Sequence, residues 1–116
     1  MKSSFKFLLI AILMVSCAPP SLYYWGDYPN TLYKYRKNTD DSSLTKHVEE
    51  LEKIINISKR RNIKVAPGLQ AELGYHYLMM NKLDEARAMF DLERVVYPES
   101  SVLMGKMIEK IERMEP

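Results

Sequence analysis

Apolar side chains recur at three- and four-residue steps along most of the chain from residue 44 onward. This spacing places them on one face of an α-helix, so it predicts a series of amphipathic helices. The stripes predict helices over residues 44–62, 67–80, 84–97 and 103–114. The sequence holds no convincing run of alternating apolar and polar residues between turn signals, which is the pattern of a strand. The pattern therefore predicts an all-α fold.

Residues with known preferences for helix ends flank these stripes. The three residues from Asp41 to Ser43 precede the first stripe as cap candidates, and Pro67 suits a first helical position. Asn81 marks a turn between the second and third helices, and Pro98 cannot continue the third. These signals predict where each helix begins and ends.

The second and third predicted helices carry small, aromatic and proline residues at fixed spacing. Gly74 and Ala86 would let the two helices approach, while Tyr77 and Phe90 would fill the space beside them. This spacing resembles the tetratricopeptide repeat, a helix-turn-helix unit of about 34 residues. The residues that carry the resemblance are Leu73, Gly74, Tyr77, Ala86, Phe90 and Pro98.

Two positions depart from the repeat pattern, and one upstream segment echoes it. Gln70 stands at a usual tryptophan and Glu93 at a usual small residue, which puts the packing against a neighbouring repeat in doubt. Residues 26–35 align more weakly with residues 81–90 and predict a short helix over 29–37. A repeat unit cannot bury its apolar face alone, so it needs neighbours. We therefore expect about five helices, arranged as tetratricopeptide-like helical hairpins with a C-terminal capping helix.

The first 16 residues have the features of an export signal. Lys2 and Lys6 give a basic start, and nine apolar residues follow before Ser16 and Cys17. Nine helical residues span about 14 Å, far less than the hydrocarbon layer of about 30 Å, so a cleaved signal is favoured over a permanent span. Cys17 is the only cysteine, so a disulfide within the chain is excluded.

Residues 13–17, Leu-Met-Val-Ser-Cys, resemble the lipobox of bacterial lipoproteins. The resemblance implies that Cys17 carries acyl chains such as palmitate and that the chain is cut before it. Ala18, in place of an aspartate, implies sorting to the outer membrane, where we expect the protein to face the periplasm. Two or more acyl chains hold a protein stably on a membrane. We expect a lipoprotein signal peptide at 1–16, a lipid anchor and spacer at 17–22, and the helical domain at 23–116.

The charge balance excludes one class of function. The 116-residue chain has 17 basic and 15 acidic side chains, a net charge of +2. Removal of Lys2 and Lys6 with the signal leaves 15 of each sign, so the mature protein is neutral. A nucleic-acid binder needs a basic surface, so we expect no nucleic-acid partner.

Several segments of the mature chain together resemble one family. They are Tyr24-Trp25-Gly26-Asp27-Tyr28, Leu32-Tyr33 with Tyr35, Pro67-Gly68-Leu69 and Ala71-Glu72-Leu73-Gly74-Tyr75. They resemble an uncharacterised family of small bacterial lipoproteins with a tetratricopeptide-like domain, over nearly all of residues 17–116. Members are often encoded near a lipoprotein similar to the curli secretion pore component, which implies a shared envelope assembly or export complex. The resemblance implies no catalytic activity.

Catalytic and metal-binding patterns are sparse. His47 and His76 are the only histidines and lie in different predicted helices, and no phosphate-binding loop or nucleophile elbow occurs. We therefore expect no enzyme and no cofactor beyond the covalent lipid on Cys17. His76, Met79 and Met80 share one helix face, where soft ligands could hold copper. Packing is favoured because no further ligand converges from the local sequence, so no metal site is expected.

The second predicted helix, the first of the repeat pair, is the expected binding surface. In tetratricopeptide repeats the first helix of each pair lines the concave face. The basic and amide groups that clamp a peptide carboxylate in some of these domains are replaced by Ala71 and Tyr75. We therefore expect an apolar or aromatic protein partner, such as another envelope lipoprotein or a secretion component. The predicted partner-binding residues are Glu72, Tyr75, Leu78 and Met79.

An aromatic cluster near the start of the mature chain suggests an alternative function. Its rings could stack on sugars of the cell wall, which would make the protein a glycan-binding lipoprotein. The other interpretation is that the rings pack the first helix onto the long one or rest near the membrane interface. The cluster comprises Tyr23, Tyr24, Trp25, Tyr28, Tyr33 and Tyr35.

Overall fold

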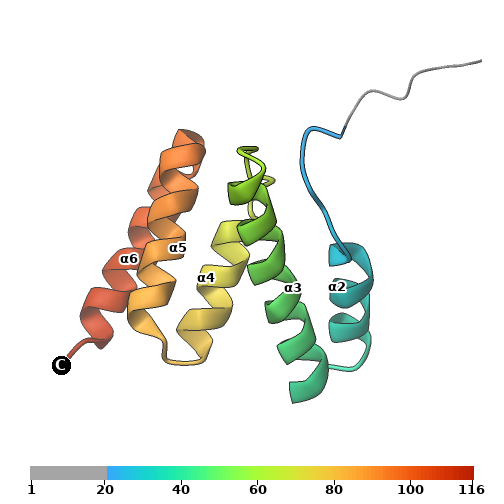
Figure 1. Ribbon diagram of the computed structural model, residues 1–116. Helices are drawn as coiled ribbons and strands as arrows, with labels where there is room; N and C mark the ends of the chain where they lie inside the picture. Colours follow the sequence, from blue (N-terminus) through green and yellow to red (C-terminus); the bar gives the residue numbers. More distant parts are fainter. Residues whose placement is uncertain (1–20) are drawn as a thin grey trace, which may run out of the picture.

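The computed structural model describes residues 21–116, which form a row of antiparallel helices (Figure 1). The elements follow one another as α2 (Tyr28–Lys37), α3 (Asp41–Arg60), α4 (Leu69–Met79), α5 (Leu83–Val96), the short 3-10 helix η1 (Pro98–Ser100) and α6 (Ser101–Met114). Each α-helix packs on the next one along the chain. The described residues contain no strand, so the predicted all-α fold of about five helices is confirmed.

The helix ends differ by a few residues from those predicted. Asp40, not a residue from 41 to 43, caps α3, because its extended backbone lets its carboxylate accept the N–H of Ser43 at 2.7 Å. Helix α4 begins at Leu69 and not at Pro67, since Gly68 occupies the N-cap with a left-handed φ of 90°. The predicted turn at Asn81 is confirmed, and Asn81 also has a positive φ of 60°.

Two adjoining clusters of buried side chains form the core. The first joins α3 to the start of α4 through residues such as Leu51, Ile54 and Leu73. The second joins the end of α4 to α5 and α6 through residues such as Phe90 and Ile111. Helix α5 therefore lies between α4 and α6, while α3 covers the other side of α4.

Small residues allow α4 and α5 to pack closely, as predicted. A Cβ atom added to Gly74 would lie 2.8 Å from Cε1 of Phe90, so no larger residue fits without movement. Ala86 is fully buried, and Phe90 fills the space beside it. Tyr77 packs against both core clusters and donates its hydroxyl to Glu52 of α3 at 2.6 Å. Pro98 opens η1 and ends α5.

Glu93 contributes to the α4–α5 contact as a helix cap. Its side chain is buried, and its carboxylate accepts the backbone N–H of Gly68 at 2.8 Å and of Ala71 at 3.4 Å. These donors lie at the start of α4, where backbone N–H groups lack partners within the helix and favour negative charge. The residue that departs from the repeat pattern therefore joins α5 to the start of α4.

Because the helices alternate in direction, one end of the row holds residue 21, the α3–α4 connection and the α5–α6 connection (Figure 1). We call this the entry end. The α2–α3 and α4–α5 connections lie at the opposite end.

Candidate functional site

The four predicted partner-binding residues of α4 have different environments. Tyr75 is 49% and Met79 68% exposed, so both offer large side chains to a partner. Leu78 is only 5% exposed, because it packs in the second core cluster with Phe90 and Met104. The prediction is therefore corrected for Leu78, which belongs to the core. Glu72 faces a polar cluster.

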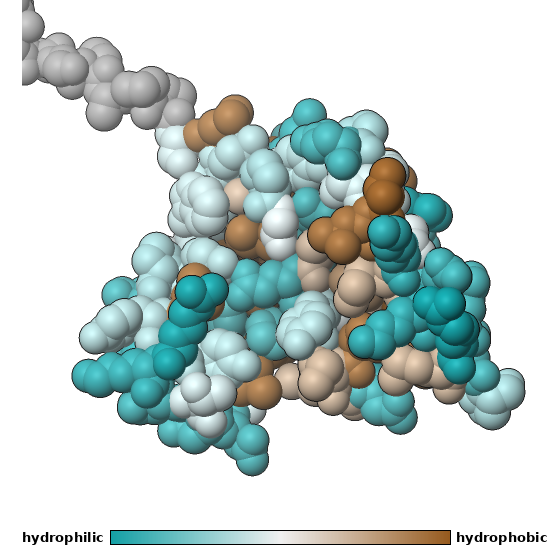
Figure 2. Space-filling view, turned by 180° about the vertical axis from the view of Figure 1, so that it is seen from behind, coloured by the Kyte–Doolittle hydropathy of each residue, from teal (hydrophilic) through white to brown (hydrophobic). Residues whose placement is uncertain are grey.

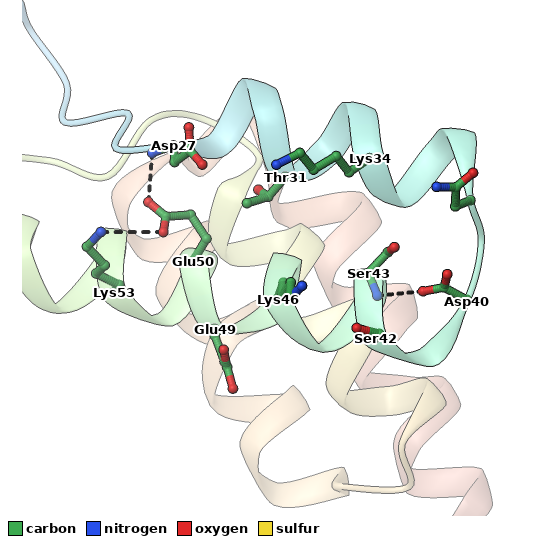
Figure 3. Close-up of a pocket in the computed structure, with 11 residues that line it drawn as sticks. Asp27, Thr31, Lys34, Asp40, Ser42, Ser43, Lys46, Glu49, Glu50 and Lys53 are labelled. Carbon is green, nitrogen blue, oxygen red and sulfur yellow. Dashed lines mark hydrogen bonds and ion pairs between the residues drawn. The ribbon is translucent and has the colours of Figure 1, made fainter.

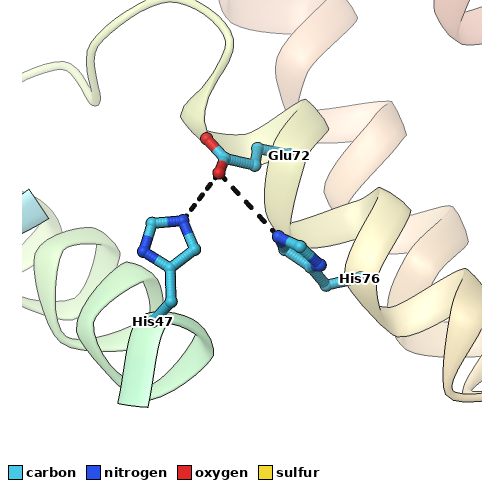
Figure 4. A group of neighbouring side chains, drawn as sticks. All are labelled: His47, Glu72 and His76. Carbon is cyan, nitrogen blue, oxygen red and sulfur yellow. Dashed lines mark hydrogen bonds and ion pairs between the residues drawn. The ribbon is translucent and has the colours of Figure 1, made fainter. Parts of the chain in front are cut away.

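That polar cluster consists of His47 from α3 with Glu72 and His76 from α4 (Figure 4). The Nε2 atom of His47 lies 2.7 Å from Oε1 of Glu72, and Nε2 of His76 lies 3.8 Å from the same oxygen. His47 is fully buried and His76 nearly so, while the Glu72 side chain keeps 25% of its surface exposed. Two histidines and a carboxylate thus converge between two helices.

Two residues of α2 extend the cluster by hydrogen bonds. The hydroxyl of Tyr28 donates to Oε2 of Glu72 at 2.7 Å, and the hydroxyl of Thr31 lies 2.9 Å from Nδ1 of His47. Thr31 also donates to the carbonyl oxygen of Tyr28 at 3.2 Å. The cluster therefore connects α2, α3 and α4 through polar contacts in a largely buried place.

The electrostatics of the cluster favour an ionised Glu72. Burial acts to raise the pKa of Glu72, but hydrogen bonds from His47, His76 and Tyr28 outweigh it and lower that pKa to about 2. Burial, together with the hydrogen bond to this carboxylate, raises the pKa of Tyr28 to about 12. Glu72 is therefore a carboxylate and Tyr28 a neutral donor at neutral pH.

Aromatic rings cover the two histidines. The ring of Tyr35 stacks on His47 with centroids 5.9 Å apart and meets His76 edge-on at 5.7 Å. Tyr28 contacts His47 from another side, with ring centroids 5.5 Å apart. Much of the predicted aromatic cluster thus packs α2 onto α3 and α4 rather than facing solvent. Trp25 and Tyr33 are the two members of that cluster that are exposed.

A groove of about 650 Å³ follows the other side of the contact between α2 and α3 (Figure 3). Its charged side chains are of both signs, and several pair within the groove. Glu50 accepts the backbone N–H of Asp27 at 2.7 Å and lies 3.5 Å from Nζ of Lys53. Lys34 and Lys46 add positive charge, and Asp40 and Glu49 add negative charge. Mixed and partly paired charges are typical of a polar surface, although Glu50 itself is buried.

The entry end combines apolar and basic side chains. Figure 2 shows hydrophobic side chains beside the segment drawn in grey and again over the α5–α6 side. No acidic residue occurs between Lys53 and Ala71, the stretch that includes the α3–α4 connection. The exposed apolar residues near this end are Leu22, Ile63, Leu92, Val95, Val102 and Leu103. The basic ones are Lys59, Arg60, Arg61 and Lys64.

An apolar groove of about 560 Å³ lies at this end, between the α3–α4 connection and α5. Ile63, Leu92 and Val96 line it together with Gln70. Gln70 is buried, and its Oε1 atom has no hydrogen-bond partner among the described residues. Ile63 also lines a neighbouring hollow with Leu22, so the apolar surface continues toward the point where the chain enters.

The chain matches the family described as Domain of unknown function (DUF4810) over residues 22–107. It belongs to this family. No curated protein matches the chain, and no solved structure matches it. The DUF4810 match runs from before α2 into α6, so it contains every residue of the polar cluster and most of the entry end. The predicted membership of an uncharacterised family is confirmed.

Two further observations concern the membrane. No helix within residues 21–116 is both long and apolar enough to cross a bilayer. Cys17 and the predicted signal at 1–16 lie outside the described residues, so their predictions rest on the sequence of this DUF4810 member.

The polar cluster is the feature that sequence reasoning missed. The four-residue step from Glu72 to His76 places both on one face of a helix and was visible in the sequence. The third member, His47, lies 25 residues before Glu72, and only the packing of α3 on α4 brings it close. The sequence places the two histidines in different helices, so it gives no sign that they meet.

Proposed function

We propose that this DUF4810 protein is an outer-membrane-anchored lipoprotein that acts as a protein–protein adaptor in a cell-envelope assembly or secretion complex. The anchor rests on the basic and apolar N-terminus and on Cys17 at the lipobox-like junction. Acyl chains on Cys17 would tether the domain at its N-terminal side and leave the helices free to bind a partner. The partner in this proposal is another envelope lipoprotein or a secretion component.

A tetratricopeptide-like arrangement is part of the proposal. The close approach at Gly74 and the burial of Ala86 and Phe90 are the packing that the repeat spacing requires. The pairing of α2 with α3 supplies a neighbour on one side, and α6 covers α5 on the other. In such an arrangement α4 is the first helix of its pair and lines the binding face.

Two exposed side chains of α4 carry the adaptor proposal. Tyr75 and Met79 lie one helical turn apart and expose 49% and 68% of their surface. Aromatic and methionine side chains are enriched in the centres of protein interfaces, where they bury large apolar area. The proposed partner surface is therefore apolar.

The entry end supports an orientation for the anchored domain. Four residues separate Cys17 from Leu22, so the tether is at most about 18 Å long in extended form. The entry end must then stay close to the bilayer. Its apolar side chains and its acid-free basic stretch suit an interface with anionic lipid headgroups. In this orientation the C-terminal half of α4, with Met79, extends away from the membrane.

Glycan binding is the weaker alternative. Four of the six rings of the aromatic cluster are partly buried, and Tyr28 and Tyr35 contact the histidines of the polar cluster. Within the cluster, the exposed rings that could stack on a sugar are Trp25 and Tyr33. If a Trp25→Ala and Tyr33→Ala double variant lost cell-wall binding while the complex stayed intact, this alternative would replace the adaptor proposal.

The anchor is tested by acyl labelling in cells. We expect the wild-type chain to incorporate labelled palmitate and to fractionate with the outer membrane, while Cys17→Ala does neither. Because Cys17 is the only cysteine, no second thiol can take up the label. Persistence of the label in Cys17→Ala would contradict the anchor.

The adaptor surface is tested by affinity purification of the full-length protein from solubilised envelopes. Met79→Glu should remove the co-purifying envelope protein, because it places a charge at the centre of the proposed apolar contact. Glu109→Lys on α6 is the matched control, since it also changes charge at an exposed helical position and should retain the partner. Retention of the same partner by Met79→Glu, at wild-type amount, would refute this surface.

A further inference from the structure

We propose that His47, Glu72 and His76 form a zinc-binding site between α3 and α4. The inference does not depend on the lipid anchor or on the adaptor surface. It rests on the convergence of the three side chains, on the hydrogen bonds that orient them, and on the charge of the cluster.

The ligand atoms have the spacing that a zinc ion needs. They all lie within 4.8 Å of one another. Zinc bound at about 2.0–2.1 Å in a tetrahedral site places neighbouring ligand atoms about 3.3 Å apart. The contacts of 2.7 Å and 3.8 Å from Glu72 to the two histidines lie on either side of that value. The two Glu72 contacts would need shifts of about half an ångström, and the two histidines, whose ligand atoms lie within 4.8 Å of each other, would approach by up to about 1.5 Å to hold the ion.

Thr31 of α2 holds the imidazole of His47 at Nδ1. Its hydroxyl oxygen lies 2.9 Å from Nδ1 and 3.2 Å from the carbonyl oxygen of Tyr28. When the Thr31 proton is donated to that carbonyl, its oxygen can accept a hydrogen from Nδ1. A hydrogen bond of this kind is what orients a metal-binding histidine and leaves Nε2 as its ligand atom.

The closest contact of the cluster joins Nε2 of His47 to Oε1 of Glu72 at 2.7 Å. A metal ion bound to these two atoms would take the place of the hydrogen bond between them. Glu72 forms no ion pair with lysine or arginine within residues 21–116, so its negative charge is available to a bound cation.

The ligand set selects the class of metal. Two imidazoles and one carboxylate suit zinc, whereas calcium and magnesium prefer oxygen ligands alone. Three protein ligands leave a fourth position for water or another small ligand, and the partly exposed Glu72 gives that position a route to solvent. The second carboxylate oxygen is held by the hydroxyl of Tyr28, so Glu72 would bind through Oε1.

Zinc titration of the chelator-treated, full-length protein in detergent tests the site. We expect one zinc ion per chain and a higher unfolding temperature when zinc is bound. His76→Gln and Glu72→Gln should abolish this binding. Thr31→Val, which removes the partner of Nδ1 together with the hydrogen bond to the carbonyl oxygen of Tyr28, should weaken it by about tenfold to a hundredfold. Glu52→Gln is the matched control, because Glu52 also accepts a tyrosine hydroxyl between α3 and α4 and lies outside the cluster.

Two outcomes would overturn the proposal. One is the absence of stoichiometric zinc binding by the wild-type protein. The other is equal binding by wild type, His76→Gln and Glu72→Gln. If these variants fail to fold by circular dichroism, X-ray absorption of the wild-type zinc complex decides. Two imidazole ligands are expected, and a sulfur ligand or an all-oxygen shell would contradict the site.

Discussion

Gly74 illustrates how one residue sets the distance between two helices. The alanine methyl group of Gly74→Ala would lie 2.8–3.1 Å from Phe90 and Met89, so the helices must move or the rings must turn. We expect this variant to lower the free energy of unfolding by about 1–3 kcal/mol. The measurement is chemical denaturation followed by circular dichroism.

Gly105 provides the matched control for that variant. It also lies within a helix, but an added Cβ would meet nothing within 4 Å. Gly105→Ala should therefore raise the free energy of unfolding by about 0.5–1 kcal/mol, because alanine favours the helix. Equal effects of the two substitutions would show that the close approach at Gly74 does not limit the packing.

Glu72 should make the stability of the protein depend on pH in the acid range. Its pKa in the folded chain is about 2, below its ordinary value of 4.5. A lowered carboxyl pKa contributes stability above the ordinary value, and this contribution is lost as the pH falls from about 4.5 toward about 2. Across this pH window, the unfolding temperature should fall more steeply with decreasing pH for wild type than for Glu72→Gln. Parallel curves would mean that Glu72 is not held ionised by the cluster.

Single residues differ in how far the sequence predicts their role. The spacing of Gly74, Ala86 and Phe90 predicts their close packing, because this packing acts between neighbouring helices. The burial of Leu78 depends on the position of α6, which the spacing along α4 does not contain. The partnership of Glu72 with His47 depends on a contact 25 residues away, which local spacing does not contain.

Helix α4 depends on α5 to satisfy the N–H groups of its first turn. Helix α4 has no side-chain cap of its own, and Glu93 of α5 accepts the N–H groups of Gly68 and Ala71. We expect Glu93→Ala to lower the free energy of unfolding by about 2 kcal/mol or more, because it leaves buried donors without partners. Glu93→Gln should lower it less, since glutamine keeps an acceptor oxygen at similar size. Denaturant unfolding measures both, and a loss under about 0.5 kcal/mol for Glu93→Ala would contradict the cap.

The predicted elements agree with the structure in number and order but not at their ends. Apolar stripes extend over several turns, so they indicated the existence of the helices reliably. The ends depend on single contacts, such as the carboxylate of Asp40 on the N–H of Ser43. The cap on α4 comes from another helix, so no sequence signal next to Gly68 could have shown it.

At the scale of the whole molecule, the entry end should bind anionic membranes without the lipid. We expect the chain that starts at residue 18, which lacks both the lipid and the predicted signal, to sediment with vesicles that contain phosphatidylglycerol, and less with neutral vesicles. Adding Lys59→Glu and Lys64→Glu should reduce this binding by roughly thirtyfold, at about 1 kcal/mol for each basic residue. Lys37→Glu with Lys82→Glu is the control, since these residues lie at the opposite end. Equal losses would indicate a general charge effect.

The overall arrangement explains why the apolar and basic surface of the entry end was not predictable from the sequence. Leu22, Ile63 and Val102 are far apart in the chain, and alternating helix directions bring them to one end. The net charge, close to neutral, also concealed the local excess of basic residues from Lys53 to Lys64. An anchored domain with this distribution would keep one end on the bilayer and offer α4 to its partner.

Site-specific photo-crosslinking in intact envelopes tests the adaptor proposal most directly. A photoreactive residue at position 79 should capture one envelope protein. The same photoreactive residue at position 102 should form adducts with lipid, or no adduct, and should not capture that protein. Capture at position 79 should disappear when Tyr75→Glu is added, because both side chains belong to the proposed contact. A protein adduct at position 102 with none at position 79 would contradict both the binding face and the orientation of the anchored domain.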